Sequence, residues 1–548
     1  MKNRSLFACA LVAAAGTVAI AQDRSYDGSG NNIANPTWGM AGTDQVRGPS
    51  GAHYTDGLGG MIDRGNPRAI TNLVSAQTPA GLGNSRNLSS WTWQWGQFLD
   101  HDLALVDDFT NDHADIAIPT GDPTFDPMGT GTAVMPLTRA VHTGGVNSPR
   151  QQQDLLTNYL DGSMVYGSDA FRANALRSHA GGRLATSAGN FLPYNTAGLI
   201  NAEPTGGTNT DPNFFVAGDI RSNEQTGLTT IHTIFMREHN RVADQIAAAN
   251  PSWNDEQIYQ KARHIVGGEI QAITYNEWLP ALLGGANAPG SYSGYNPNVN
   301  ATMNATFSGA AFRLGHTMLN DVLPRYNADG THYAGGDLTL FQQFFNPFAI
   351  QQAGSLDAIV RGLARQQANE IDAKVIDGVR NLLFGGTNGR DLIAVNIQRG
   401  RDDGLPDYNT VRQDYGLVPV TGFDQISSDP AVQAALQAAY GNVNNIDVFI
   451  GLFAEDHLPG GSMGATETAI LVDQFTKLRD GDRFFYLNDS TLTADEQAYL
   501  SGLRLSDIFR WNTGATDVQD NIFFAVPAPG SVLALGAFGL LATRRRRA

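Results

Sequence analysis

The sequence has almost no cysteine. Its single cysteine in 548 residues, Cys9, lies within residues 1–21, which have the pattern of a secretory signal: a basic start, an apolar run and small residues at Ala19 and Ala21. Once such a signal is removed, the exported chain contains no cysteine and cannot form a disulfide. We therefore expect an extracellular or cell-surface protein that is stabilised by something other than disulfides.

Positive charge is also scarce. The chain carries 36 Lys+Arg against 53 Asp+Glu, which gives a formal net charge of −17. A body of this charge repels nucleic acid and anionic membrane surfaces, since both are negative. The composition therefore argues against a nucleic-acid-binding protein.

The C-terminal apolar run, residues 531–543, is shorter than the ~20 residues that cross a membrane as a helix. It follows the Pro-containing stretch 526–530 and precedes four arginines. Residues 526–548 therefore resemble the bacterial PEP-CTERM sorting signal, which a processing protease removes during surface delivery. Ala528 replaces the usual glutamate of that signal. The alternative is a tail that is retained as a membrane anchor.

Long alternating strand patterns are scarce and coiled-coil heptads are absent. Residues 22–84 are rich in Gly, Asn, Asp and Pro and indicate an extended arm. Helical patterns dominate from residue 85 onward, with apolar residues at helical spacing or with capping residues in the segments 168–178, 228–249, 255–279 and 429–441. The prediction is a mainly α protein with little β structure and a main domain over 85–520.

The segment WTWQWGQFLDHDL, residues 91–103, concentrates polar chemistry in one predicted helix. Gln97 lies three and four residues before Asp100 and His101, so all three share a face. Asp102 is about 100° further round and is free to hold something separate, such as a cation. This spacing predicts that one face serves chemistry and the other serves structure.

The segment TNYLDGS offers oxygen atoms at alternate residues: Thr157, the main chain of Tyr159, Asp161 and Ser163. Alternate oxygen ligands wrap a hard cation such as calcium, and Asp102 can supply a second carboxylate. The alternative is an ordinary loop with helix-capping side chains.

Further along, Arg221 and Glu224 are three residues apart at the predicted start of a helix. A guanidinium aimed into a pocket stabilises developing negative charge, whereas the alternative is a surface ion pair. His232 and His239 follow on the same helix, and we expect them to serve packing and hydrogen bonding rather than metal ligation.

The last two segments that contain candidate functional side chains are AFRLGHTML and LIAVNIQRGRDD. His316 lies in an apolar setting after Gly315, and a neutral imidazole is a good iron ligand. Asn396 can orient such an imidazole through its second nitrogen, and Arg399 suits a carboxylate. Each segment taken alone also fits a buried structural histidine or a polar loop.

Together these segments resemble the animal-type haem peroxidases, the family of myeloperoxidase, lactoperoxidase and peroxidasin. The similarity runs from about Tyr26 to Leu487. WGQFLDHD, LDGSMVYGS, RSNE followed by MREHNRVA, ITYNEWLPALLG, FRLGHTML, NIQRGRDDGLPDYN and FAEDHLPGG through LRDGDRFFY occur in the family's order. The resemblance implies a single large helical peroxidase domain, bound haem b and hydrogen peroxide as substrate.

The resemblance also implies roles for individual residues. His101 matches the distal histidine that transfers the peroxide proton, Arg221 the distal arginine, and Gln97 the amide near a small-anion site. His316 matches the proximal iron ligand, with Asn396 as its hydrogen-bond partner. Arg399 matches a contact to a haem propionate.

Asp100 and Glu224 match the carboxyls that form ester links to haem in the mammalian members. In myeloperoxidase the next residue is a methionine bonded to a haem vinyl, but here it is Gln225. A sulfonium link is not available at that position, which disfavours chloride as a donor. Asp102, Thr157, Tyr159, Asp161 and Ser163 match the family's calcium ligands.

The resemblance implies an oxoferryl oxidant that takes electrons from bromide, iodide, thiocyanate or phenols. One alternative is a fatty-acid dioxygenase of the same superfamily, but its Tyr-x-Trp-His string is absent. A second is an adhesion or matrix protein with a vestigial haem site. If residues 101, 161, 221, 316 and 396 build one site, the chain between them folds as one domain, although about 150 residues per domain predicts three or four.

Overall fold

The computed structural model describes residues 23–77, 82–108, 111–203, 207–383 and 389–526. The predicted signal and nearly all of the predicted C-terminal tail lie outside these residues. Within the described ranges, no helix is both long enough and apolar enough to cross a membrane.

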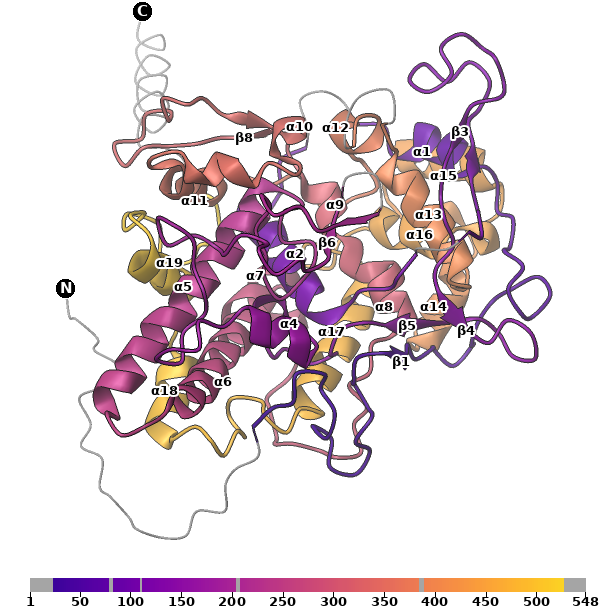
Figure 1. Cartoon of the computed structure of the whole chain (residues 1–548). Helices are drawn as coiled ribbons and strands as arrows, with labels where there is room; N and C mark the ends of the chain where they lie inside the picture. Colours follow the sequence, from indigo (N-terminus) through magenta and orange to yellow (C-terminus); the bar gives the residue numbers. More distant parts are fainter. Residues whose placement is uncertain (1–22, 78–81, 109–110, 204–206, 384–388, 527–548) are drawn as a thin grey trace, which may run out of the picture.

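The described chain is mainly helical, as predicted (Figure 1). Its helices are α1 Pro67–Val74, α2 Ser90–Leu103, α3 Ser163–Tyr166, α4 Ala170–Ala175, α5 Thr226–Ala249, α6 Asp255–Ile273, α7 Leu279–Leu283, α8 Ala305–Gly309, α9 Gly315–Met318, α10 Leu340–Gln343, α11 Ser355–Arg365, α12 Asp377–Arg380, α13 Leu392–Asp402, α14 Tyr408–Asp414, α15 Pro430–Tyr440, α16 Val448–Ala454, α17 Ala465–Asp480, α18 Ala494–Ser501 and α19 Leu505–Asn512.

The strands are short and lie in small antiparallel sheets. They are β1 Thr43–Asp44, β2 Ile116–Ala117, β3 Val134–Met135, β4 His142–Thr143, β5 Gln151–Asp154, β6 Asn201–Ala202, β7 Thr208–Asn209, β8 Val322–Leu323 and β9 Leu338–Thr339. The largest sheet has the order β1-β5-β4, with Thr43 paired to Asp154 and His142 paired to Gln152.

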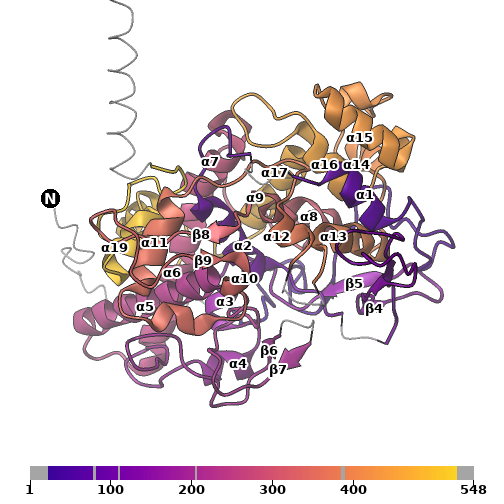
Figure 2. The same cartoon turned by 90° about the horizontal axis from the view of Figure 1, so that it is seen from above.

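Helix α2 lies at the centre of the molecule in both views (Figures 1 and 2). It packs on α3, α5, α9 and α11, and α5 packs along α6. Trp91, Trp95 and Phe98 on α2 are fully buried. Burying three aromatic side chains stabilises the helix's position by several kcal/mol, at roughly 1.5–3 kcal/mol each. The polar residues of α2 are therefore held on a rigid central element.

Local capping signals match several helix ends. Asp429 caps α15, Pro430 is its first residue, and Gly441 ends it in the left-handed region at φ 68°. The segment predicted at 168–178 forms only the shorter α4, which Asp169 caps. The pattern predicted over 255–279 is interrupted after Ile273 by a π-helical turn at Thr274–Trp278.

The N-terminal segment 22–84 contains α1, for which its loop-like composition gave no helical signal. Asn66 caps α1, Pro67 begins it, and Ile70 and Val74 are buried where it packs on α13 and α15. One hydrophobic core runs from Ile70 to Phe523, so the segment is part of the same folded body. Packing against distant helices stabilises α1, which is too short to be stable alone.

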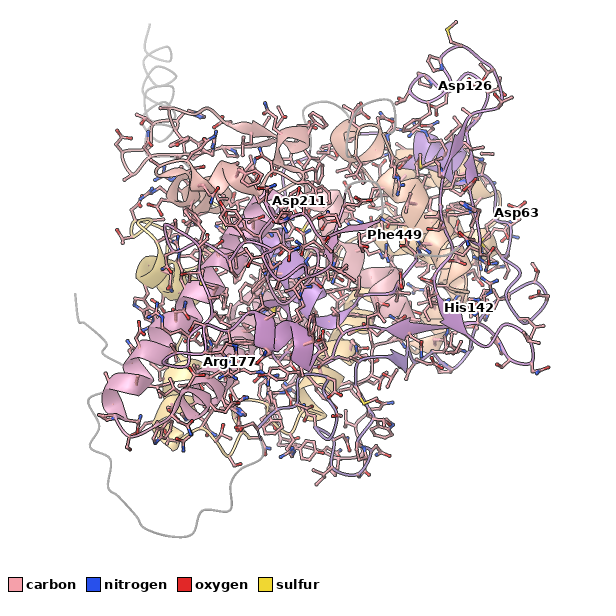
Figure 3. All side chains as sticks on the ribbon, viewed as in Figure 1. Asp63, Asp126, His142, Arg177, Asp211 and Phe449 are labelled. Atoms are coloured by element: carbon pink, nitrogen blue, oxygen red, sulfur yellow. The ribbon has the colours of Figure 1, made fainter. Side chains whose placement is uncertain are left out.

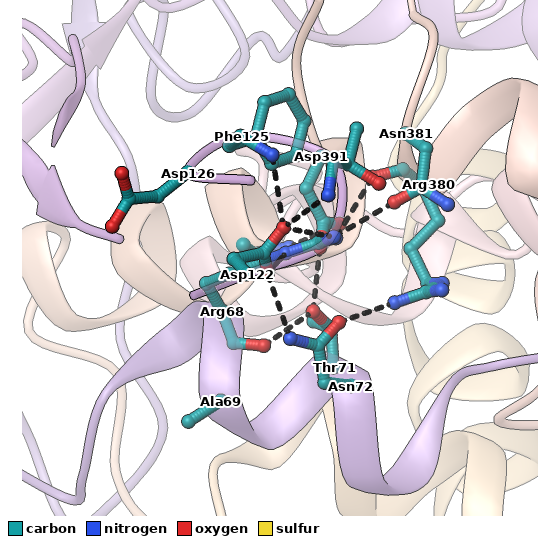
Figure 4. Close-up of polar contacts among 12 residues, drawn as sticks. Arg68, Ala69, Thr71, Asn72, Asp122, Phe125, Asp126, Arg380, Asn381 and Asp391 are labelled. Carbon is teal, nitrogen blue, oxygen red and sulfur yellow. Dashed lines mark hydrogen bonds and ion pairs between the residues drawn. The ribbon is translucent and has the colours of Figure 1, made fainter. Parts of the chain in front are cut away.

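A buried polar cluster around Arg68 links the N-terminal segment to the later helices (Figure 4). The Arg68 guanidinium is fully buried and pairs with Asp122 at 2.7 Å and with Asp391 at 2.8 Å. Asp391 caps α13 and also accepts a hydrogen bond from Thr71. Asp126, on the same loop as Asp122, lies at the edge of the molecule (Figure 3). These charge-assisted bonds hold together segments more than 300 residues apart, as a disulfide would.

Candidate active site

A cavity lies between α2, the segment before α5, and the helices α9 and α13. Its volume is about 860 Å³. Seven of the residues singled out from the sequence line it: Gln97, Asp100, His101, Arg221, Glu224, His316 and Arg399. Asn396 lies just behind the wall and contacts the cavity through His316. Residues up to 302 positions apart in the chain thus meet in one space.

Helix α2 presents its two polar faces to different surroundings, as its spacing predicts. Gln97, Asp100 and His101 line the cavity. Asp102 points the other way, where its carboxylate accepts hydrogen bonds from the Ser163 hydroxyl at 2.7 Å and the Gly162 N–H at 3.2 Å.

Arg221 does not lie on a helix. Helix α5 begins at Thr226 with Gln225 as its cap, and Arg221 to Glu224 form the turn before it. The prediction of a helix start at Arg221 is therefore wrong: extended Gln225 caps α5 through its side chain, so the helix cannot begin earlier. The guanidinium pairs with Asp219 at 2.9 Å and with Asp100 at 3.4 Å.

Asp219 is a central residue that the sequence reasoning missed. It is fully buried and accepts from Nε, Nη2 and the main-chain N–H of Arg221. Its Oδ1 also lies 3.4 Å from His101 Nδ1. Burial alone would raise the pKa of Asp219, but Arg221 and His101 outweigh burial and lower it, so the carboxylate stays ionised. The sequence signal for this pairing is that Asp219 lies two residues before Arg221.

His101 is buried and uncharged at neutral pH. Burial and the nearby positive charge of Arg221 lower its pKa well below the usual value. Its Nε2 faces Glu224 at 3.7 Å. Burial also raises the pKa of Glu224, to about 7, and Gln97 donates a hydrogen bond to this carboxyl at 2.9 Å. The cavity therefore holds the neutral imidazole of His101 near the positively charged guanidinium of Arg221.

On the opposite wall, His316 Nδ1 lies 2.8 Å from the Asn396 side-chain amide. Burial, with Arg313 as the second cause, lowers the pKa of His316 to about 3, so its imidazole is neutral. Arg313 was also missed. It donates to Asn396 Oδ1 at 2.9 Å and to the Ser308 carbonyl at 3.1 Å, which holds the amide in place.

Arg399 lines the cavity but has carboxylate partners of its own. It pairs with Asp108 at 2.7 Å and with Asp402 at 3.0 Å. Its planar guanidinium is therefore held rigidly at the wall, between an exposed and a buried carboxylate.

The five residues predicted as calcium ligands lie close together next to α2. Thr157 Oγ1 contacts Asp161 Oδ2 at 3.3 Å, and the Ser163 hydroxyl donates to Asp102. Asp102 and Asp161 are both buried, and burial together with their mutual repulsion raises the pKa of Asp102 to about 8. Among the described residues, no group of three or more His, Cys, Asp or Glu side chains has a metal-binding arrangement.

His232 and His239 lie in helix α5, away from the cavity wall. His239 bonds the Gly182 carbonyl at 2.8 Å and the Tyr166 hydroxyl at 3.0 Å. His232 packs edge-on against Phe98. Both surroundings are those of core histidines.

Residues 23–523 match the animal haem peroxidase family. The chain is 35% identical to peroxinectin A of Dictyostelium discoideum over 84% of this chain and 88% of that protein. It is 34% identical to the mouse (Mus musculus) peroxidasin homolog over 92% of this chain, but spans only 38% of that longer protein.

Among solved structures, peroxidase A of Dictyostelium discoideum superposes with a TM-score of 0.84 at 32% identity, covering 92% of this chain and 99% of that one. A fatty acid alpha-dioxygenase of Oryza sativa reaches a TM-score of 0.73 at 19% identity, over 92% of this chain and 87% of that one. The second likeness concerns the fold alone. The cavity with its paired histidines and the match over nearly the whole described chain show that this protein belongs to the animal haem peroxidase family and is a peroxidase.

Proposed function

We propose that this chain is an exported haem b peroxidase that uses hydrogen peroxide to oxidise bromide, iodide, thiocyanate or phenolic donors. The observation that carries the proposal is the pairing of two neutral imidazoles in one cavity. His101 has an ionised arginine beside it, and His316 has an amide behind it.

The cavity fits a haem in size and in chemistry. A volume of about 860 Å³ lies within the 300–1,000 Å³ of typical cofactor and ligand sites. His316 is neutral and is held by Asn396, as an iron ligand requires. His101 Nδ1 is buried without a hydrogen-bond partner, so the imidazole is free to exchange a proton at the opposite nitrogen. A haem held here supplies the redox-active iron through which peroxide reduction is coupled to donor oxidation.

The chain's own residues then act on the peroxide. His101, uncharged at neutral pH, accepts a proton at Nε2 from one peroxide oxygen and returns it to the other, so that the second oxygen leaves as water. Arg221 stabilises the negative charge that develops on the leaving oxygen. Asp219 keeps the guanidinium in place, and its negative carboxylate lies 3.4 Å from His101 Nδ1.

The walls also suit the haem edge. Asp100 and Glu224 line the cavity and can form ester links to haem methyl carbons, with hydrogen peroxide as the two-electron oxidant that each such bond requires. Arg399 suits a propionate contact. Gln225 donates to Gln97 at 2.9 Å, so a polar amide pair occupies the place of a thioether and supports donors that are easier to oxidise than chloride.

A calcium ion is the second proposed cofactor, bound by Asp102, Thr157, Tyr159, Asp161 and Ser163. Two buried carboxylates face each other beside hydroxyl and carbonyl oxygens, and a divalent cation removes their repulsion. Because Asp102 is next to His101 on α2, this ion would hold the catalytic histidine in position.

The proposed location is extracellular or at the cell surface. It rests on the signal pattern at 1–21 and on the arginine-ended tail at 526–548. The tail would be removed by a sorting protease or kept as an anchor, which mass spectrometry of the mature protein distinguishes.

Steady-state turnover tests the function. Haem-loaded protein is given hydrogen peroxide and, at one pH, chloride, bromide, iodide, thiocyanate or a phenol. We expect turnover of the last four donors. His101→Ala should keep the Soret band and lose about 10²-fold or more of its peroxide reactivity, while exposed His332→Ala stays at the wild-type rate. Rapid peroxide reaction in His101→Ala would refute the role of His101.

A further inference from the structure

The outer part of the cavity has a feature that peroxide chemistry does not require. Three apolar side chains that line it, Leu155, Phe171 and Ile200, also reach solvent, with exposures of 42%, 74% and 53%. They are the residue after β5, a residue of α4 and the residue before β6. We call them the apolar rim. Figure 2 shows α4, β6 and β7 on the same side of the molecule.

Hydrogen bonds hold the backbone of each segment that carries a rim side chain. Arg172, next to Phe171 on α4, donates to the Ile200 carbonyl at 2.8 Å and to the Ala217 carbonyl at 2.7 Å. The Leu155 N–H bonds the Leu105 carbonyl on the chain leaving α2. These bonds fix the backbone beneath each rim side chain. Hydrogen peroxide and halide ions gain nothing from an apolar surface, whereas an aromatic ring gains from its burial.

The charge around this opening is negative. Carboxyl side chains that line the cavity outnumber its arginines by eight to four, and by six to four when the two proposed ester-linking residues, Asp100 and Glu224, are left out. Asp107, Asp169 and Glu203 are at least partly open to solvent. Of the four arginines, Arg399 is paired with Asp108 and Asp402, and Arg221 is paired with Asp219. Hydrogen peroxide is neutral and enters freely, but an anion approaches against this field.

We propose that the apolar rim and the acidic opening make this peroxidase select uncharged or cationic aromatic donors, phenols and aromatic amines, over anions. The inference rests on the proposed function and narrows its donor class. In each turnover one hydrogen peroxide is reduced to two waters, while two phenol molecules each lose one electron and one proton and become phenoxyl radicals.

The test uses three para-substituted phenols that differ in charge: tyramine, p-cresol and 4-hydroxyphenylacetate. On haem-loaded protein at pH 7 and low ionic strength, we expect kcat/KM for tyramine and p-cresol to exceed that for 4-hydroxyphenylacetate by roughly 10-fold or more. The gap should narrow in 0.5 M salt because the field is screened. Phe171→Ser and Ile200→Ser should each lower kcat/KM for p-cresol by roughly 3- to 10-fold, mainly through KM, with iodide unaffected.

The two control substitutions, Val418→Ser and Asp495→Asn, change residues that do not line the cavity. Val418→Ser removes a side chain that is 80% exposed and should change no donor. Asp169→Asn removes a charge and keeps the α4 cap, since asparagine caps as well, and should lower the tyramine preference. Asp495→Asn should not. Saturation-transfer NMR of p-cresol reads binding without turnover and should weaken in Phe171→Ser.

The outcomes separate the two claims. Donor oxidation in which 4-hydroxyphenylacetate or iodide is preferred, or rim variants that bind p-cresol normally, would overturn the inference and leave the peroxidase proposal intact. No turnover with any donor would overturn both.

Discussion

Asp219 holds Arg221 through both carboxylate oxygens at 2.9 Å, and one of these oxygens also lies 3.4 Å from His101 Nδ1. One buried carboxylate therefore sets the position of both polar groups that face the proposed peroxide site. Its negative charge also raises the pKa of His101 against the stronger effects of burial and Arg221, which lower it.

Asp219→Asn should retain haem and lower kcat/KM for hydrogen peroxide by roughly 10- to 100-fold, because Arg221 loses its charged partner. The pKa of His101 should fall further, so the acid limb of the pH–rate profile moves to lower pH. Asp211→Asn, at a half-buried residue that does not line the cavity, is the control. An unshifted acid limb would assign Asp219 a purely structural role.

Removing calcium should lower the melting temperature, because an ion bound only to the native state stabilises it by mass action. We expect a drop of roughly 5 °C or more on adding EGTA, and Asp161→Asn should abolish the response. Asp495→Asn should melt and respond as wild type does. An unchanged melt together with no calcium in elemental analysis would remove the ion from the proposal.

Arg68→Met should destabilise the fold by about 3–5 kcal/mol, since it leaves Asp122 and Asp391 buried without their partner. Arg183→Met breaks an exposed pair with Asp244 and should cost about 1 kcal/mol or less. Urea unfolding midpoints compare the two. Equal midpoints would show that the Arg68 cluster does not replace a disulfide energetically.

His239 should make stability depend on pH. Burial lowers its pKa in the folded state to about 4, below the ordinary 6.5. Its contribution is therefore complete above pH 6.5 and is lost as the pH falls toward 4, by a total on the order of 3 kcal/mol.

His239→Gln cannot titrate, so its unfolding free energy should depend less on pH between 6.5 and 4 than that of the wild type. Urea unfolding at pH 7 and pH 4.5 measures the difference. His332→Gln, at an exposed histidine, should keep the wild-type dependence. Parallel curves for His239→Gln and wild type would show that folding does not lower the pKa of His239.

Several features of the fold and site could be predicted because they depend on neighbours in sequence. The spacing of Gln97, Asp100 and His101 gives one helix face whatever surrounds it, and all three line the cavity. The cap of α15 at Asp429 and its end at Gly441 likewise follow from local backbone preferences.

Other features depend on contacts that spacing cannot reveal. Helix α1 is stabilised because it packs on α13 and α15, more than 300 residues later in the chain, and buries Ile70 and Val74. Arg221 lies in a turn because Asp219 grips it and Gln225 caps the next helix. Arg313 donates to Asn396 Oδ1 at 2.9 Å across 83 positions of the chain, a contact that spacing does not reveal.

The helical character of the chain, the polar face of α2 and, through the motifs, the family can be read from the residue order. That His101 and His316 share one cavity, that Asp219 pairs with Arg221 and that three exposed apolar side chains line the outer part of this cavity follows from the packing of distant segments. Helix periodicity and caps act over a few residues, whereas burial, charge pairing and cavity shape depend on which distant segments pack together.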